Sequence, residues 1–246
     1  MFKRDILFHL EKWKDDTHRK PLILRGARQV GKTTVVNEFG KQFDNYLYLN
    51  LEKREAASLF ELNVSLKDLM PLFFAHCGKI RNEGTILLFI DEIQNSAKAV
   101  ALLRYFYEEL PDIYVIAAGS LLENLIDVRV SFPVGRVQYM ALRPCSFREF
   151  LGAVGEEPLL SVLDKPEITL PFHDRLMLLF NIYTLIGGMP EVVQLYAERR
   201  DILSLESTYE TLLQGYRDDV EKYALGKQLP EVIRFILKEG WHKAGQ

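Results

Sequence analysis

The sequence predicts an α/β fold built on a parallel sheet, followed by an all-α region. Up to about residue 145, short apolar segments alternate with segments of helical periodicity, which is the pattern of a doubly wound sheet. Residues 85–92 are continuously apolar until they end in two acids, as expected of a parallel strand covered on both faces. Beyond Arg143-Pro144 the pattern is helical. We therefore expect a core domain over residues 1–145 and a helical domain over residues 146–246.

The core domain is expected to begin with an amphipathic helix, because Ile6, Leu10 and Trp13 recur at helical spacing. Packing of this helix on the core is favoured over contact with a membrane. Strands are expected at residues 21–24, 46–51, 85–92, 113–118 and 137–142, and the alternating pattern of the last one indicates an edge strand. Helices are expected at residues 33–41, 55–62, 66–80 and 97–110, with Ser65 as the cap of the third.

The helical domain is expected to open with a capping box, since Ser146 is followed by Glu149 and then by apolar residues. A looser stretch is expected from Gly152 to Pro171. Further helices are expected at residues 173–186, 191–199, 203–224 and 230–239, with Pro190 in the first turn of the second.

The amino-acid composition excludes several classes of protein. A chain of 246 residues, 48% of them hydrophobic, can bury a sizeable core. Its formal net charge of −3 argues against a surface that binds polyanions throughout. Two cysteines give no disulfide framework and favour a cytoplasmic location, and the five histidines show no metal-ligand spacing. No apolar run is long enough to cross a bilayer, so no membrane partner is expected.

The most specific motif lies between the first strand and the next helix. Residues 26–34 read GARQVGKTT and match the phosphate-binding pattern G-x-x-x-x-G-K-[ST]. Glycine lets backbone N–H groups approach a phosphate closely, and the N-terminus of the following helix favours negative charge. Lys32 is expected to contact the β- and γ-phosphates, and Thr33 to complete a Mg²⁺ shell. The predicted nucleotide-binding residues are Gly26, Ala27, Arg28, Gln29, Val30, Gly31, Lys32, Thr33 and Thr34.

Two acids follow the most apolar strand. Ligands of parallel sheets bind at the carboxyl ends of strands, where the chain places Asp91 and Glu92. Asp91 is expected to hold Mg²⁺, and Glu92 to orient and deprotonate the attacking water. At the end of the next strand, Ser120 either contacts the γ-phosphate or the attacking water, or caps the following helix.

Six segments together resemble a known group, the prokaryotic AAA-type ATPases of poorly defined function. The resemblance covers about residues 1–240. The segments are LRGARQVGKTT (24–34), LFIDEIQ (88–94), AAGSLL (117–122), FPVGRV (132–137), LRPCSFREFL (142–151) and GGMPEV (187–192).

The resemblance implies an AAA-like P-loop core, with the phosphate-loop strand at the sheet centre, the strand of the acids beside it, and a helical lid. It gives Ser120 a sensor-like role. Members of the group usually continue into a further C-terminal domain, in some cases nuclease-like. The chain is therefore expected to be either a truncated piece or a short natural member.

Arginines of two kinds are candidates in such an enzyme. An AAA-type ATPase often supplies an arginine to the γ-phosphate of a neighbouring subunit, and the candidates are Arg129 and, preferably, Arg136. A structural salt bridge or turn is the alternative for Arg136. Arg175 and Arg217 are candidates for a nucleotide-sensing lid arginine, with a solvated helix face as the alternative.

The function predicted is Mg²⁺-dependent ATP binding and hydrolysis coupled to movement of the lid, and slow without a partner. ATP is favoured over GTP because no N-K-x-D segment is present. The alternatives are a regulatory switch with little turnover, a DNA-associated remodelling factor and, more weakly, a small-molecule kinase. The expected partners are ATP and ADP, a second copy of the chain, and a nucleic acid or protein client.

Overall fold

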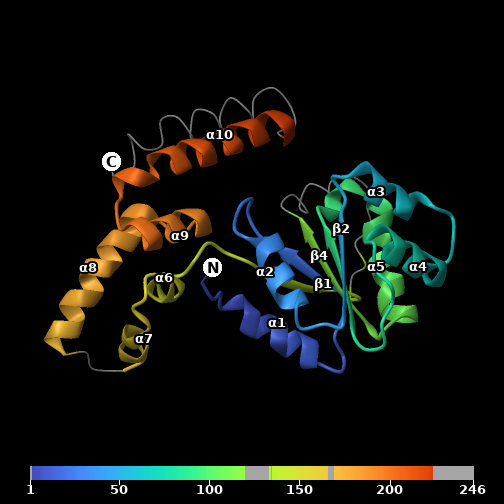
Figure 1. The fold of residues 1–246 in the computed structure, drawn as a ribbon, viewed down its shortest axis with the longest axis horizontal. Helices are drawn as coiled ribbons and strands as arrows, with labels where there is room; N and C mark the ends of the chain where they lie inside the picture. Colours follow the sequence, from blue (N-terminus) through green and yellow to red (C-terminus); the bar gives the residue numbers. More distant parts are fainter. Residues whose placement is uncertain (1, 120–132, 134, 166–168, 224–246) are drawn as a thin grey trace. The chain divides into compact units, whose positions relative to one another are not determined.

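The computed structural model describes residues 2–119, 133, 135–165 and 169–223. The chain divides into two compact units, one of Lys3–Glu149 and one of Phe150–Gln246 with Met1–Phe2. Figure 1 shows the elements of each, and each is described by itself. We call them the sheet unit and the helical unit.

The sheet unit is built on five parallel strands in the order β2-β3-β4-β1-β5. The predicted α/β fold with a five-stranded parallel sheet is thus confirmed, and β5 lies at an edge as expected. The described strands are β1 (Leu22–Arg25), β2 (Asn45–Asn50), β3 (Ile86–Asp91), β4 (Ile113–Gly119) and β5 (Gln138–Ala141). All six residues of β3 are buried, which accounts for its continuously apolar sequence.

The expected place of β1 in the sheet was wrong. β1 is not at the centre, and the acid-bearing β3 is not beside it, because β4 pairs with both strands. Strand order depends on long-range pairing, which the sequence of each strand does not specify. β4 ends in three small buried residues, Ala117, Ala118 and Gly119.

Helices cover both faces of this sheet (Figure 1). One apolar cluster packs α1 and α2 on one face, and includes Ile6, Leu10 and Trp13, so the predicted core packing of the first helix is confirmed. A second cluster packs α3, α4 and α5 on the other face. Ser65 caps α4 as expected, by accepting a hydrogen bond from the Asp68 N–H. The described helices are α1 (Ile6–Asp15), α2 (Lys32–Gly40), α3 (Arg54–Glu61), α4 (Leu66–His76) and α5 (Ala97–Glu109).

The helical unit continues from α6, whose first residues belong to the sheet unit. The described helices are α6 (Phe147–Ala153), α7 (Glu157–Leu163), α8 (Leu170–Ile186), α9 (Pro190–Arg199) and α10 (Glu206–Tyr223), with a 3-10 turn at Leu203–Leu205. The capping box is confirmed, since Ser146 and Glu149 exchange hydrogen bonds. The loose stretch expected from Gly152 was wrong at α7, where Pro158 suits the first turn and Leu159 and Val162 are buried.

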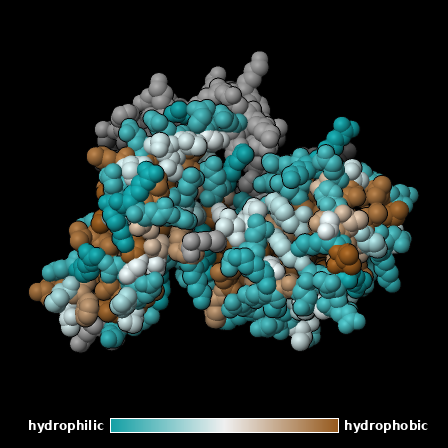
Figure 2. Space-filling model, viewed as in Figure 1, coloured by the Kyte–Doolittle hydropathy of each residue, from teal (hydrophilic) through white to brown (hydrophobic). Residues whose placement is uncertain are grey.

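The helical unit has several large apolar side chains exposed along α8, among them Phe172, Leu178 and Leu185. Apolar residues gather over α8 in Figure 2. Only Leu176, Leu179 and Ile186 of that helix are buried. The predicted helix at residues 230–239 lies outside the described residues. In the described part of the chain, no helix has the length and apolar character needed to span a membrane.

Candidate active site: the phosphate loop and the acids of β3

The phosphate loop joins β1 to α2. β1 ends at Arg25, and α2 begins at Lys32 after Gly31 in the left-handed conformation, with φ 88°. A Cβ on Gly26 would lie 2.3 Å from the carbonyl oxygen of Leu142, far inside van der Waals contact. Only glycine therefore fits at the start of this loop. Residues 26–31 connect a buried strand to a helix, and Lys32, Thr33 and Thr34 form the first turn of that helix, as phosphate binding requires.

Lys32 is buried inside this turn. Its Nζ atom donates to the carbonyl oxygens of Gly26 and Ala27, each at 2.9 Å. Burial lowers the pKa of Lys32 from its usual value, and the nearby carboxylates of Glu92 and Asp91 raise it by less. A buried ammonium at the N-terminus of a helix is suited to binding an anion, because the helix N-terminus also favours negative charge.

Thr33 and Asp91 are brought into direct contact. The Thr33 Oγ1 hydroxyl donates to Asp91 Oδ2 at 2.7 Å, across the end of β4. The other carboxylate oxygen, Oδ1, accepts from the Glu92 N–H at 3.1 Å. Hydroxyl and carboxylate oxygens are the ligands that Mg²⁺ prefers, so these two residues fit the predicted metal site.

Glu92 follows in a left-handed conformation, with φ 52° and ψ 44°. A non-glycine residue there costs about 1–3 kcal/mol, and such residues cluster at functional sites. Gln94 Nε2 donates to Glu92 Oε2, which fixes the direction of the carboxylate. The sequence did not predict a role for Gln94, because its contact depends on the sharp turn at Glu92.

Tyr48 is a second residue that the sequence analysis missed. Its hydroxyl donates to Asp91 Oδ2 at 3.3 Å, and its ring stacks on Phe89 with centroids 5.4 Å apart. Burial, and then the charge of Asp91, raise the pKa of Tyr48 to about 12, so the hydroxyl stays a donor. The alternating burial pattern of β2 was the signal that could have indicated Tyr48. The last residue of that strand, Asn50, pairs with Asp91 of β3.

The remaining predicted site residues are placed as follows. Ser120 and Arg129 lie outside the described residues. Arg136 forms an ion pair with Glu108, with Nε 2.5 Å from Oε1, and is not in contact with the loop. Arg175 pairs with Glu156 at the surface of the helical unit. Arg217 is exposed on α10.

The Arg19-Lys20 pair, considered for nucleic-acid binding, makes contacts inside the sheet unit. The Arg19 guanidinium lies over the Tyr114 ring at 3.7 Å from its centroid. Lys20 Nζ donates to the carbonyl of Gly135 at 2.6 Å. These cations therefore already have partners on the protein.

The solved structures similar to this chain include a Walker-type ATPase of Pyrococcus abyssi. It is 18% identical, with a TM-score of 0.54, over 90% of this chain and 75% of that one. The Drosophila ORC bound to DNA is 16% identical, with a TM-score of 0.48, over 90% of this chain and 67% of that one. At these identities the likeness concerns the fold alone. No curated protein matches the sequence.

The family comparison covers the site itself. The model of the AAA domain family matches residues 18–151, which is more than half of the chain. This span contains the strands of the sheet, the phosphate loop and both acids. The resemblance noted in the sequence is therefore confirmed, and the chain belongs to the AAA domain family of P-loop ATPases.

Proposed function

We propose that the protein is a Mg²⁺-dependent ATPase whose site consists of the phosphate loop and the acids that follow β3. The observation that carries the proposal is the 2.7 Å hydrogen bond between Thr33 and Asp91. This bond joins two segments that are far apart in sequence. Lys32 and Glu92 are the sequence neighbours of the bonded pair, and the charge of Glu92 acts on Lys32. A site that only bound phosphate would not need the two acids.

Each loop residue has a part in ATP binding. The backbone of residues 26–31 would surround the β-phosphate with N–H groups, which Gly26 and Gly31 make possible by their shape and conformation. Lys32 would exchange its contacts with the loop carbonyls for the β- and γ-phosphate oxygens. Because its ammonium is buried, that exchange replaces neutral acceptors by charged ones in a poorly solvated site.

Thr33 and Asp91 would hold Mg²⁺. The ion would polarise the phosphate oxygens and offset their charge. Tyr48 holds the Asp91 carboxylate on the side of β2 and keeps its oxygens turned toward Thr33.

Glu92 would accept the proton of the attacking water. Its strained backbone and its bond to Gln94 aim the carboxylate before the substrate arrives. The presence of this acid favours hydrolysis over a switch that only binds nucleotide. An arginine of a second copy, with Arg136 as the candidate, would complete the site, and the nucleotide state would drive movement of the helical unit as a lid. The cytoplasmic location, the preference for ATP and the client stay predictions.

ATP turnover in Mg²⁺ tests this function. The wild-type chain is expected to release phosphate from ATP, whereas Lys32→Ala loses ATP binding and turnover. Lys41→Ala is the matched control, because Lys41 is exposed just after the end of the same helix and pairs with Glu38 at the surface. Absence of ATP binding by the wild-type protein would contradict the proposal. Equal turnover of wild type and Lys32→Ala would do the same.

A further inference from the structure

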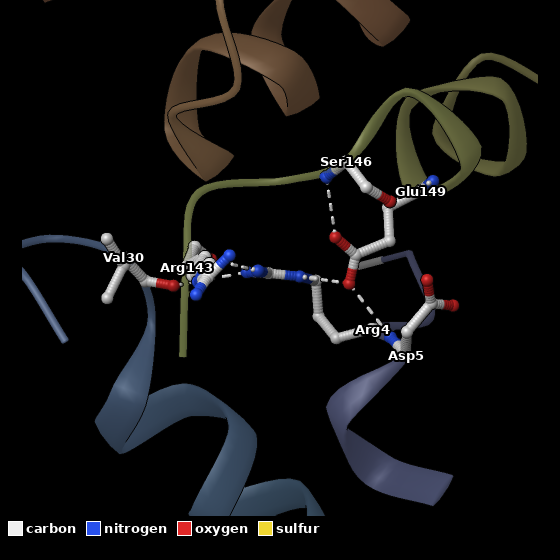
Figure 3. Close-up of polar contacts among 6 residues, drawn as sticks. All are labelled: Arg4, Asp5, Val30, Arg143, Ser146 and Glu149. Carbon is white, nitrogen blue, oxygen red and sulfur yellow. Dashed lines mark hydrogen bonds and ion pairs between the residues drawn. The ribbon is translucent and has the colours of Figure 1, made fainter. Parts of the chain in front are cut away.

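A buried cluster around Arg4 connects three segments of the sheet unit (Figure 3). The Arg4 side chain is only 4% exposed, and its Nε atom lies 2.8 Å from Oε1 of Glu149, itself 6% exposed. Its Nη1 atom donates to the carbonyl of Val30 at 3.1 Å, and its Nη2 atom to the carbonyl of Arg143 at 2.7 Å. One guanidinium thus binds the phosphate loop, the segment after β5 and the first turn of α6.

Glu149 has a full set of partners in this cluster. Its Oε1 atom accepts from Arg4 and from the Asp5 N–H, both at 2.8 Å. Its Oε2 atom accepts from the Ser146 N–H at 2.8 Å, which is half of the capping box of α6. A buried ion pair is favourable only with such additional hydrogen bonds, and with them its geometry is tightly fixed.

The contact with Val30 bears directly on the phosphate loop. The carbonyl of Val30 and the N–H of Gly31 belong to one planar trans peptide, so they point in opposite directions. By holding the carbonyl, Arg4 orients the Gly31 N–H away from itself. The charged donor also polarises the peptide and strengthens its N–H as a donor.

A second contact joins the same segments at the other end of the loop. Gly26 packs so closely on the carbonyl of Leu142 that a Cβ would lie 2.3 Å from it. The Leu142 N–H donates to the carbonyl of Arg25 at 2.7 Å. The segment 142–149 therefore contacts both ends of the phosphate loop, at Gly26 directly and at Val30 through Arg4.

We propose that Arg4 is a positioning residue of the phosphate loop, and that the Arg4–Glu149 pair couples nucleotide binding to the start of α6. The inference rests on the proposed function, since it requires ATP in the loop. A phosphate bound by the Gly31 N–H would tighten the same peptide that Arg4 holds. That tightening would be transmitted to Glu149 and to the cap of the helix that leads into the helical unit.

The experiment uses the full chain and a reporter inside the segment. Cys145 is 1% exposed, and burial raises the pKa of its thiol to about 12, so a thiol reagent reaches it only when the segment opens. The only other cysteine is removed by Cys77→Ser. Labelling of Cys145 by a disulfide reagent, with and without ATP and Mg²⁺, then reports how firmly residues 142–149 are held.

Three variants separate positioning from stability. Arg4→Met removes all three donors but leaves a buried carboxylate without its charge partner. Arg4→Met combined with Glu149→Gln removes that charge as well and keeps a residue able to form the capping box. Leu10→Ala destabilises α1, the helix that follows Arg4, through a buried apolar residue, and is the control for lost stability alone.

The dissociation constant of ATP is measured at a temperature at which circular dichroism shows each variant folded. Both Arg4 variants are expected to raise it by about 10-fold or more, whereas Leu10→Ala changes it by less than about twofold. The double variant is expected to be more thermally stable than Arg4→Met but to bind ATP no more tightly. ATP is expected to slow the labelling of Cys145 by about fivefold or more with Arg4 present, and to have no effect on it in the double variant.

Two outcomes would overturn this inference and leave the proposed function intact. One is that the wild-type chain binds ATP and the folded Arg4 variants bind it as tightly as Leu10→Ala does. The other is that ATP protects Cys145 equally in the double variant. If the wild-type chain does not bind ATP, the proposed function fails, and this inference fails with it.

Discussion

The sheet unit and the helical unit differ in where they keep their polar groups. The buried polar side chains of the described residues are Arg4, Lys32, Asn45, Asp91, Ser96 and Glu149, and all belong to the sheet unit. The helical unit instead shows surface pairs, such as Arg175 with Glu156. Surface pairs contribute little to stability, whereas buried charges are costly and need specific partners.

This difference supports different roles for the two units, with the proposed ATP site in the sheet unit. Buried charges are retained where binding or catalysis needs them, and three of those in the sheet unit lie on the phosphate loop or within hydrogen-bond reach of it. The helical unit instead has apolar side chains exposed along α8, and no buried charge among its described residues. The predictions below test this difference in roles.

Arg136→Ala gives the largest expected effect. If Arg136 acts on the site of a second copy, its loss lowers ATP turnover by about 10³-fold or more and leaves ATP binding unchanged. Arg104→Ala is the matched control, because Arg104 also donates to Glu108, at 2.9 Å. Turnover is measured over a range of protein concentrations. Equal behaviour of the two variants would assign Arg136 a structural pairing only.

Gly26→Ala is expected to weaken ATP binding by about 100-fold or more, since the added Cβ must displace the loop or Leu142. The measurement is a titration with ATP and Mg²⁺, with folding checked by circular dichroism. Normal ATP binding by this variant would show that the loop tolerates the displacement. It would contradict the assignment of ATP binding to this loop of the sheet unit.

The pH dependence of ATP binding follows from the lowered pKa of Lys32. Since this pKa lies below the usual value of 10.5, the ammonium loses its proton at a lower pH than that of a free lysine, and ATP affinity falls as the pH rises through the lowered pKa. Stability changes in the opposite direction, because the unfolded chain still binds the proton there and the cost of burying the charge disappears. ATP affinity and stability of the wild-type chain are measured from pH 7 upward, and Lys32→Met, which has no ammonium to titrate, is expected to lose the rise in stability.

Gly152→Ala gives the smallest effect and belongs to the helical unit. Gly152 lies in α6, and a Cβ there would meet no atom within 4 Å. Alanine is expected to stabilise the protein by about 0.5 kcal/mol, because it restricts the unfolded chain more than glycine does. Thermal unfolding gives the stability, and ATP affinity is expected to stay unchanged. A loss of affinity would show that α6 is coupled to the site by its own packing.

What the sequence predicted correctly depends on neighbouring residues. The loop between β1 and α2, the acids at the end of the buried β3 and the capping box of Ser146 and Glu149 each occupy one short segment, whose residue types reflect local geometry. The roles of the loop and of the acids stay predictions. The five parallel strands followed from apolar runs separated by helices.

What the sequence did not predict depends on tertiary contacts. The contacts of Tyr48 and Arg4 require strand order and chain reversals that bring distant residues together. The place of β1 was predicted wrongly for the same reason, since pairing with β4 leaves no mark within either strand. The helix α7 was missed because Pro158 was read as part of a loose stretch.

The most direct test of the account is the separation of ATP binding from ATP turnover in Glu92→Gln, with the exposed Glu52→Gln as control. The account predicts that Glu92→Gln binds ATP within about threefold of wild type and hydrolyses it at least about 10²-fold more slowly, because only the water-activating carboxylate is lost. Equal turnover by wild type and Glu92→Gln would contradict it, and would leave a nucleotide-binding switch as the better description.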